Sequence, residues 1–148
     1  MTGRALTAPS VLRLRCFPDA DGLLTVGEFD GELPFEPRRV FFVSRVPAGA
    51  LRADHAQRTG AQVLVAAHGR FAVDAYTATR PSSFVLHEPT SALHVPPGNW
   101  ITCRDFSPDA VMLVLASDPY DRDDQIEDFR DYLRFAGAAP SREVALTS

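Results

Sequence analysis

A histidine and a glutamine two residues apart are the residues best placed to do chemistry. They lie in the segment Arg-Ala-Asp-His-Ala-Gln, residues 52–57. Because alternate side chains of an extended strand share a face, His55 and Gln57 would point together into a space enclosed by a sheet, with Asp54 and Ala56 on the opposite face. An imidazole can exchange a proton near neutral pH, as a general base must. A glutamine neither titrates there nor ligates metals well, so the pair argues against a metal site.

The composition of the chain bounds what kind of protein it encodes. Its 148 residues are 45% hydrophobic, and no apolar run approaches the length of a membrane span, so we expect one domain without a membrane partner. With 15 basic and 19 acidic residues the net charge is -4, which does not favour nucleic acid as a partner. Cys16 and Cys103 are far apart, and no apolar signal segment opens the sequence. These features predict a cytoplasmic protein with two free thiols.

Short strands separated by turns must position these residues. The alternation in residues 10–16, the turn at residues 19–22 and the apolar segment 23–29 predict a hairpin. Further strands are expected at residues 38–46, 61–67, 70–75, 83–87, 91–95, 99–104 and 110–116. Many short strands at this spacing indicate an all-β sandwich or barrel and not a fold built from βαβ units.

Only the C-terminal part of the sequence has a helical pattern. Ile126, Phe129, Leu133 and Ala136 recur at helical spacing, and acidic residues precede them from residue 123 onward. We therefore expect a short helix from residue 123 that ends near Gly137. Residues 1–9 and 137–148 are predicted to be flexible segments on either side of one domain at residues 10–136.

Seven segments, in this order along the chain, resemble one family of small cupins. They include Gly-Leu-Leu-Thr-Val-Gly-Glu at residues 22–28, Leu-Pro-Phe-Glu-Pro-Arg-Arg-Val-Phe-Phe at 33–42, Arg-Ala-Asp-His-Ala at 52–56 and Val-Pro-Pro-Gly-Asn-Trp at 95–100. The others lie at residues 62–65, 105–117 and 120–124. The family is that of the WxcM-like nucleotide-sugar 3,4-ketoisomerases. The resemblance implies a cupin jelly-roll β-barrel, commonly a homodimer, that acts on a dTDP-4-keto-6-deoxyhexose without a metal or other cofactor.

Moving a ketone from C4 to C3 of a sugar requires a base for the C3 proton and cationic donors for the enediolate and the diphosphate. His55 matches the family's base, and Arg52 and Arg39 are of the right kind to stabilise the anions. Candidate substrate-binding residues are Gln57, Phe41, Gln62, Trp100 and His94. Trp100 follows a Pro-Pro-Gly turn at an expected barrel rim, where it could stack on a ligand. His94 would face either solvent or the cavity.

Several positions depart from the family pattern. Ala53 replaces a glycine and Gln57 a second histidine, while Phe41-Phe42 lacks a tyrosine. Ile101 stands where a histidine is usual, and Asp21 where an arginine is. The jelly-roll is therefore expected to be kept more fully than the chemistry.

Three hypotheses follow. The first is an isomerase of nucleotide-linked keto sugars in deoxysugar or natural-product biosynthesis. The second, favoured by the reduced polarity at residues 41, 42, 53 and 101, is an isomerase or cyclase acting on an apolar secondary-metabolite intermediate. The third, favoured by Gln57, is an inactive dimeric binding or accessory protein.

Overall fold

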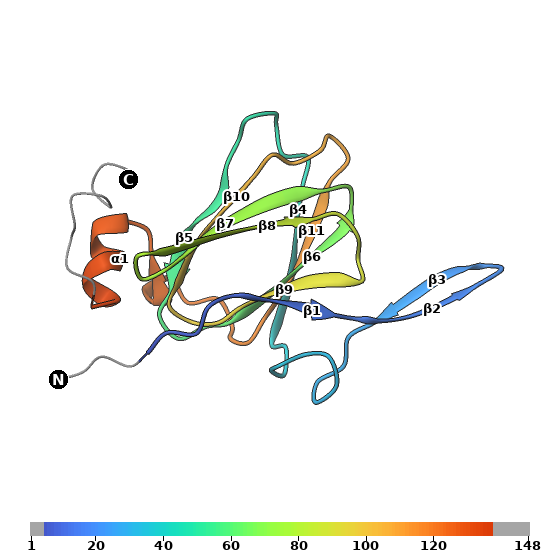
Figure 1. The fold of residues 1–148 in the computed structure, drawn as a ribbon, viewed down its shortest axis with the longest axis horizontal. Coiled ribbons are helices and arrows are strands. Elements are labelled where there is room, and N and C mark those ends of the chain that lie inside the picture. Colours follow the sequence, from blue (N-terminus) through green and yellow to red (C-terminus); the bar gives the residue numbers. More distant parts are fainter. Residues whose placement is uncertain (1–4, 138–148) are drawn as a thin grey trace.

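Two five-stranded antiparallel sheets form the body of the protein in the computed structural model, which describes residues 5–137 (Figure 1). The first sheet has the order β1-β9-β6-β11-β4, with bounds Ser10–Arg13, Ser91–Val95, Gln62–His68, Val111–Ala116 and Arg39–Ser44. The second has the order β12-β5-β10-β7-β8, with bounds Gln125–Ile126, Arg52–Gln57, Asn99–Arg104, Phe71–Thr77 and Arg80–Leu86. This confirms the predicted all-β fold, and most of the predicted strands match within a few residues.

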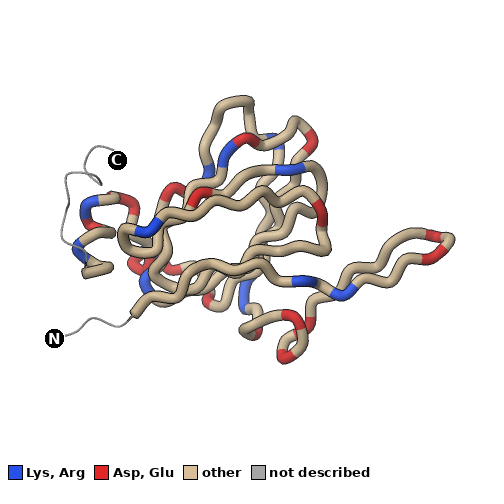
Figure 2. Tube along the Cα trace, viewed as in Figure 1, with Lys and Arg blue, Asp and Glu red and all other residues tan. Residues whose placement is uncertain are grey.

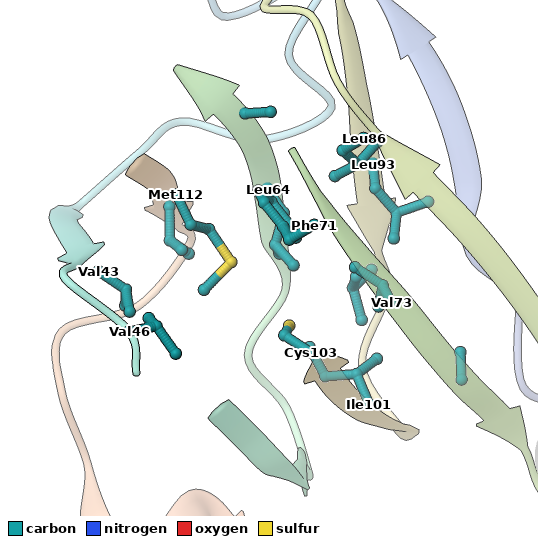
Figure 3. Close-up of a cluster of buried hydrophobic side chains, with 14 residues drawn as sticks. Val43, Val46, Leu64, Phe71, Val73, Leu86, Leu93, Ile101, Cys103 and Met112 are labelled. Atoms are coloured by element: carbon teal, nitrogen blue, oxygen red, sulfur yellow. The ribbon is translucent and has the colours of Figure 1, made fainter. Parts of the chain in front are cut away.

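An apolar core fills the space between the two sheets. Leu64 and Phe71 are each 1% exposed, and Val73 and Cys103 are fully buried. Figure 3 shows Met112 and side chains from both sheets converging on this cluster. Burying one large apolar side chain contributes about 1.5 to 3 kcal/mol, so the inward residues of both sheets hold the body together.

A separate two-stranded arm follows β1 in the sequence and leaves the body. It consists of β2 (Arg15–Asp19) and β3 (Gly22–Val26), and it projects away from the sheets in Figure 1. The predicted hairpin was wrong in one respect, because the strand expected at residues 10–16 splits at Leu14. Residues 10–13 pair with β9, and the Leu14 amide donates to the Thr90 carbonyl. Leu14 packs on the cluster around Leu33, which fixes the chain where the arm begins.

The C-terminal helix begins later than its periodicity suggested. Helix α1 spans Phe129–Phe135, and the Asp128 carboxylate caps it by accepting from the amides of Arg130 and Asp131. Ile126 lies in β12, which pairs with β5, and a single 3₁₀ turn precedes it at Arg122–Asp124. The expected start at residue 123 was therefore wrong, because the apolar Ile126 packs against the sheet from a strand. The helix ends before Gly137, which has a φ of 73°.

The predicted flexible ends lie largely outside the described residues, at 1–4 and 138–148. Within the described part, the Thr7 carbonyl accepts a hydrogen bond from Asn99, and Pro9 is buried. No described helix has the length and apolarity that crossing a membrane would require. Both cysteines are free thiols, with Cys16 exposed and Cys103 buried.

Candidate active site

A cavity of about 100 Å³ lies between the two sheets. Four residues singled out from the sequence line it: Phe41, Arg52, His55 and Gln62. The remaining lining is almost wholly apolar and consists of Val43, Ala53, Leu64, Ile101, Cys103, Met112 and Val114. A smaller hollow shares His55, Gln62 and Ile101 with this cavity and adds Gln57. The structure thus brings His55 and Gln57 to the same region, as their spacing predicted.

His55 is the titratable centre of the cavity. Its side chain is half-buried, and its Nδ1 atom is buried without a hydrogen-bond partner among the described residues. Burial lowers the pKa of His55 below its ordinary value of 6.5, and the charge of Arg39 lowers it further, whereas Glu127 and Asp54 oppose the shift. The imidazole is therefore neutral at neutral pH, which is the form that a base needs.

A β-bulge just before His55 sets which side chains enter the cavity. The register between β5 and β10 shifts between Ile101 and Thr102, and Ala53 and Asp54 have φ values of 63° and 61°. The bulge interrupts the alternation, so both Arg52 and Ala53 line the cavity. Asp54 instead accepts a hydrogen bond of 2.9 Å from the Thr102 hydroxyl on the outer face.

Arg39 lies beside this cavity on β4. Its guanidinium carbon is 5.1 Å from the centre of the Phe41 ring and 5.5 Å from that of Tyr120. Its Nε atom is buried without a hydrogen-bond partner in residues 5–137. Two aromatic rings thus orient the Arg39 guanidinium, and its Nε–H group remains available to donate to an anion.

The C-terminal segment fastens the strand that carries Gln57. β12 pairs with residues 56 and 57, and the Arg58 amide donates to the Asp124 carbonyl. The Asp124 carboxylate accepts from the amides of Thr59 and Gly60 at 2.8 and 3.0 Å. The turn after β5 is therefore held by several hydrogen bonds, which fix the end of β5 beside the cavity.

Two predicted site residues lie elsewhere. Trp100 is on the outer face of the second sheet, where its ring packs against Phe129 and Tyr132 at centroid distances of 5.2 and 5.8 Å. Ile101 points inward, so its neighbour Trp100 must point outward. His94 lies outside the cavity lining, half-buried against Phe35, and burial lowers its pKa.

Sequence reasoning missed two residues near the site. Cys103 lines the cavity, and burial raises the pKa of its thiol to about 12. The alternation of Ile101 and Cys103 within residues 99–104 could have indicated it. Tyr120, which packs on Arg39, lies in the loop after β11, where no periodicity marks it. No group of three or more His, Cys, Asp or Glu residues suited to a metal occurs in the described part of the chain.

The site has the form of a cupin-type small-molecule site. Two antiparallel sheets face each other around a cavity, which holds one neutral imidazole with guanidinium groups nearby. Comparison with known proteins makes this specific. The family described as FdtA: WxcM-like, C-terminal matches residues 7–137, and the chain belongs to it. The predicted family is thereby confirmed.

Named relatives match this chain along most of their length. The chain is 31% identical, over 84% of its length and 90% of the relative's, to a TDP-4-oxo-6-deoxy-alpha-D-glucose-3,4-oxoisomerase of Aneurinibacillus thermoaerophilus. A 3,4-ketoisomerase from Helicobacter canadensis is 29% identical with a TM-score of 0.84, covering 87% of this chain and 97% of that one. The sugar 3,4-ketoisomerase QdtA from Thermoanaerobacterium thermosaccharolyticum, solved with TDP, is 27% identical with a TM-score of 0.85, covering 89% and 96%.

Proposed function

We propose that this protein is an isomerase that moves the ketone of a TDP-linked 4-keto-6-deoxyhexose from C4 to C3. The observation that carries the proposal is the neutral imidazole of His55 in a cavity between the two sheets, beside Arg52 and Arg39. The activity of the relatives supports it, because the oxoisomerase that is 31% identical to this chain acts on the corresponding sugar.

Each side chain has a role that its chemistry allows. His55 removes the C3 proton, since a neutral imidazole is a base of suitable strength. Arg52 and Arg39 stabilise the negative charge of the enediolate and the diphosphate by charge-assisted hydrogen bonds. Gln57 and Gln62 can donate to and accept from sugar hydroxyls, and Phe41 holds Arg39 in place. The reaction needs no metal or cofactor in this scheme, and we place it in the cytoplasm, where free thiols stay reduced.

Conversion of the sugar is the direct test. The protein is incubated with TDP-4-keto-6-deoxyglucose, and the products are followed by NMR, with TDP-glucose as a control that has no ketone. We expect a 3-keto product from the first compound alone and the same rate after treatment with a chelator. Tight binding of TDP without conversion would favour a non-catalytic binding protein. Absence of TDP binding would favour the apolar substrate.

We further propose that the protein is a homodimer. The stem of the arm is apolar and exposed, with Leu24 61% exposed and Phe17 and Leu23 nearly as much so. In Figure 2 charge appears only toward the tip and the base of the arm. A two-stranded hairpin is marginally stable alone, and contiguous exposed apolar side chains mark interaction sites. The outer face of β4 also exposes apolar side chains, those of Val40 and Phe42, to which the arm of a second copy could bind.

Light scattering in solution tests the dimer. We expect twice the chain mass of 16.2 kDa for the wild-type protein and a monomer for the double variant Phe17→Asp, Leu24→Asp. Val85→Asp, which changes an equally exposed residue on the other sheet, should remain dimeric. A wild-type monomer, or a dimer in the double variant, would contradict this assembly.

A further inference from the structure

The cavity presents one group suited to moving a proton near neutral pH. Gln57 and Ile101, from the same sheet, and Phe41, from the facing sheet, line the cavity or the adjoining hollow with His55, and none of the three is titratable. Guanidinium groups donate hydrogen bonds and do not give up a proton under these conditions, so Arg39 and Arg52 can hold charge but cannot relay a proton.

The carboxyl groups of Asp54 and Glu127 line a separate pocket beside Trp100. The two remaining side chains that could in principle supply a second proton are Cys103 and Tyr120. Cys103 lines the cavity but is fully buried within the apolar core, and burial raises the pKa of its thiol to about 12. That thiol is a much weaker acid than an imidazolium. Tyr120 is 63% exposed and covers Arg39 without lining the cavity. In the described part of the chain, neither is placed to protonate a sugar carbon in the cavity as an imidazolium would be.

We propose that His55 alone carries the proton from C3 to C4, on one face of the sugar ring. A fraction of the product molecules therefore keeps at C4 the hydrogen that left C3, and the new C4 hydroxyl is axial. The inference rests on the proposed ketoisomerase activity and specifies its stereochemical course. Gln57 and Ile101 determine this stereochemical course, because neither side chain can act as a second acid.

The proton and electron balance of this route is complete without a further reactant. The imidazole takes the C3 proton, the C3–H electron pair forms the C3–C4 double bond, and the C4 carbonyl oxygen takes the negative charge. The 3-hydroxyl proton passes to the oxygen on C4, and the C3–O bond becomes the new carbonyl. The C3–C4 π electrons then take the proton back from the imidazolium at C4, which restores neutral His55.

The geometry of the sugar fixes the product. In a 4-keto sugar with the D-gluco configuration, the C3 hydrogen and the C3 hydroxyl lie on opposite faces. A proton returned to C4 from the face that lost the C3 proton places the C4 hydroxyl on the other face, which gives the galacto configuration. A second acid on the opposite face would give the gluco configuration instead.

Substrate deuterated at C3 tests this course. The wild-type enzyme converts TDP-4-keto-6-deoxy-[3-²H]glucose in ordinary water, and the product is analysed by NMR and mass spectrometry while little substrate has reacted. We expect deuterium at C4 in part of the product and an axial C4 hydroxyl throughout. A gluco product, or a product with no deuterium at C4, would overturn the proposal. Neither result would affect the proposed function, whereas a lack of any conversion would refute that function itself.

Matched variants sharpen the result. Gln57→His adds an imidazole that exchanges with water, so the retained deuterium should fall at least about twofold, whereas Gln57→Met should keep the wild-type fraction. Equal retention in these two variants would contradict the role given to residue 57. Tyr120→Phe should keep both the retention and the axial product, and a change in either would make Tyr120 a second acid.

Discussion

The two faces of the sheet β12-β5-β10-β7-β8 have different roles, although the residues on them are neighbours in sequence. The inner face presents His55 and Ile101 to the cavity, while the outer face packs Ala56 and Trp100 beneath helix α1 with Tyr132. Strand alternation thus assigns reactive and stabilising roles to adjacent positions. Changes on the inner face should alter turnover, and changes on the outer face should alter the free energy of unfolding.

The largest effect on stability is expected at Trp100. Trp100→Ala should lower the free energy of unfolding by about 3 to 5 kcal/mol, because it opens a cavity beneath α1. The KM of the folded enzyme should stay within about twofold of the wild-type value, since no catalytic contact is lost. Denaturant unfolding and steady-state kinetics measure both quantities, with Trp100→Phe as the milder variant. A large rise in KM without a loss of stability would place Trp100 in the site.

The next largest effect is a loss of catalytic efficiency, which we expect at Arg39 on the inner side. Arg39→Met should lower kcat/KM roughly 10- to 100-fold, because one charge-assisted hydrogen bond to an anion is lost. The melting temperature should change little. Arg80→Met changes an exposed arginine at the start of β8; this variant is the control and should be neutral. Equal losses in the two variants would mean that Arg39 does not act on the substrate.

These contrasts show what the sequence could foretell. The family resemblance grouped His55, Arg52 and Arg39. Alternation alone would put Arg52 on the face opposite His55, and the bulge is what brings Arg52 into the cavity. The same alternation places Trp100 outward, but the Pro-Pro-Gly turn before it suggested a ligand platform. Alanine itself gives no signal for the left-handed backbone at Ala53 and Asp54, so the indication of the bulge was the glycine that is usual at residue 53 in the family. Ile126 kept a helical spacing by coincidence, since tertiary pairing with β5 decided its conformation.

The pH dependence of kcat/KM sharpens the account of His55. Burial lowers the pKa of His55 below 6.5, so the neutral base persists at neutral pH and is lost only as the pH falls through the lowered pKa. Activity should therefore be level at neutral pH and decline on the acidic side with a midpoint below 6.5, before any acid unfolding detected by fluorescence. An acidic limb with its midpoint above 6.5 would show that His55 is not the base or is not desolvated.

The smallest effect concerns the backbone before His55. Ala53 has a φ of 63°, a conformation that glycine adopts without strain, so Ala53→Gly should stabilise the protein by about 1 kcal/mol. Ala56→Gly, in a regular part of the same strand, should instead destabilise it by about 1 kcal/mol. Thermal unfolding compares the two, and a loss of stability in Ala53→Gly would mean that the bulge is unstrained.

The most direct test of the central claim is a measurement of binding and turnover together in His55→Asn. Calorimetry with TDP should give an affinity within about threefold of the wild-type value, because the arginines remain in place. Turnover of TDP-4-keto-6-deoxyglucose should fall about 1,000-fold, because the base is gone. His87→Asn, an exposed histidine after β8, should match the wild type in both. Turnover in His55→Asn close to the wild-type rate would contradict the assignment of His55 as the base.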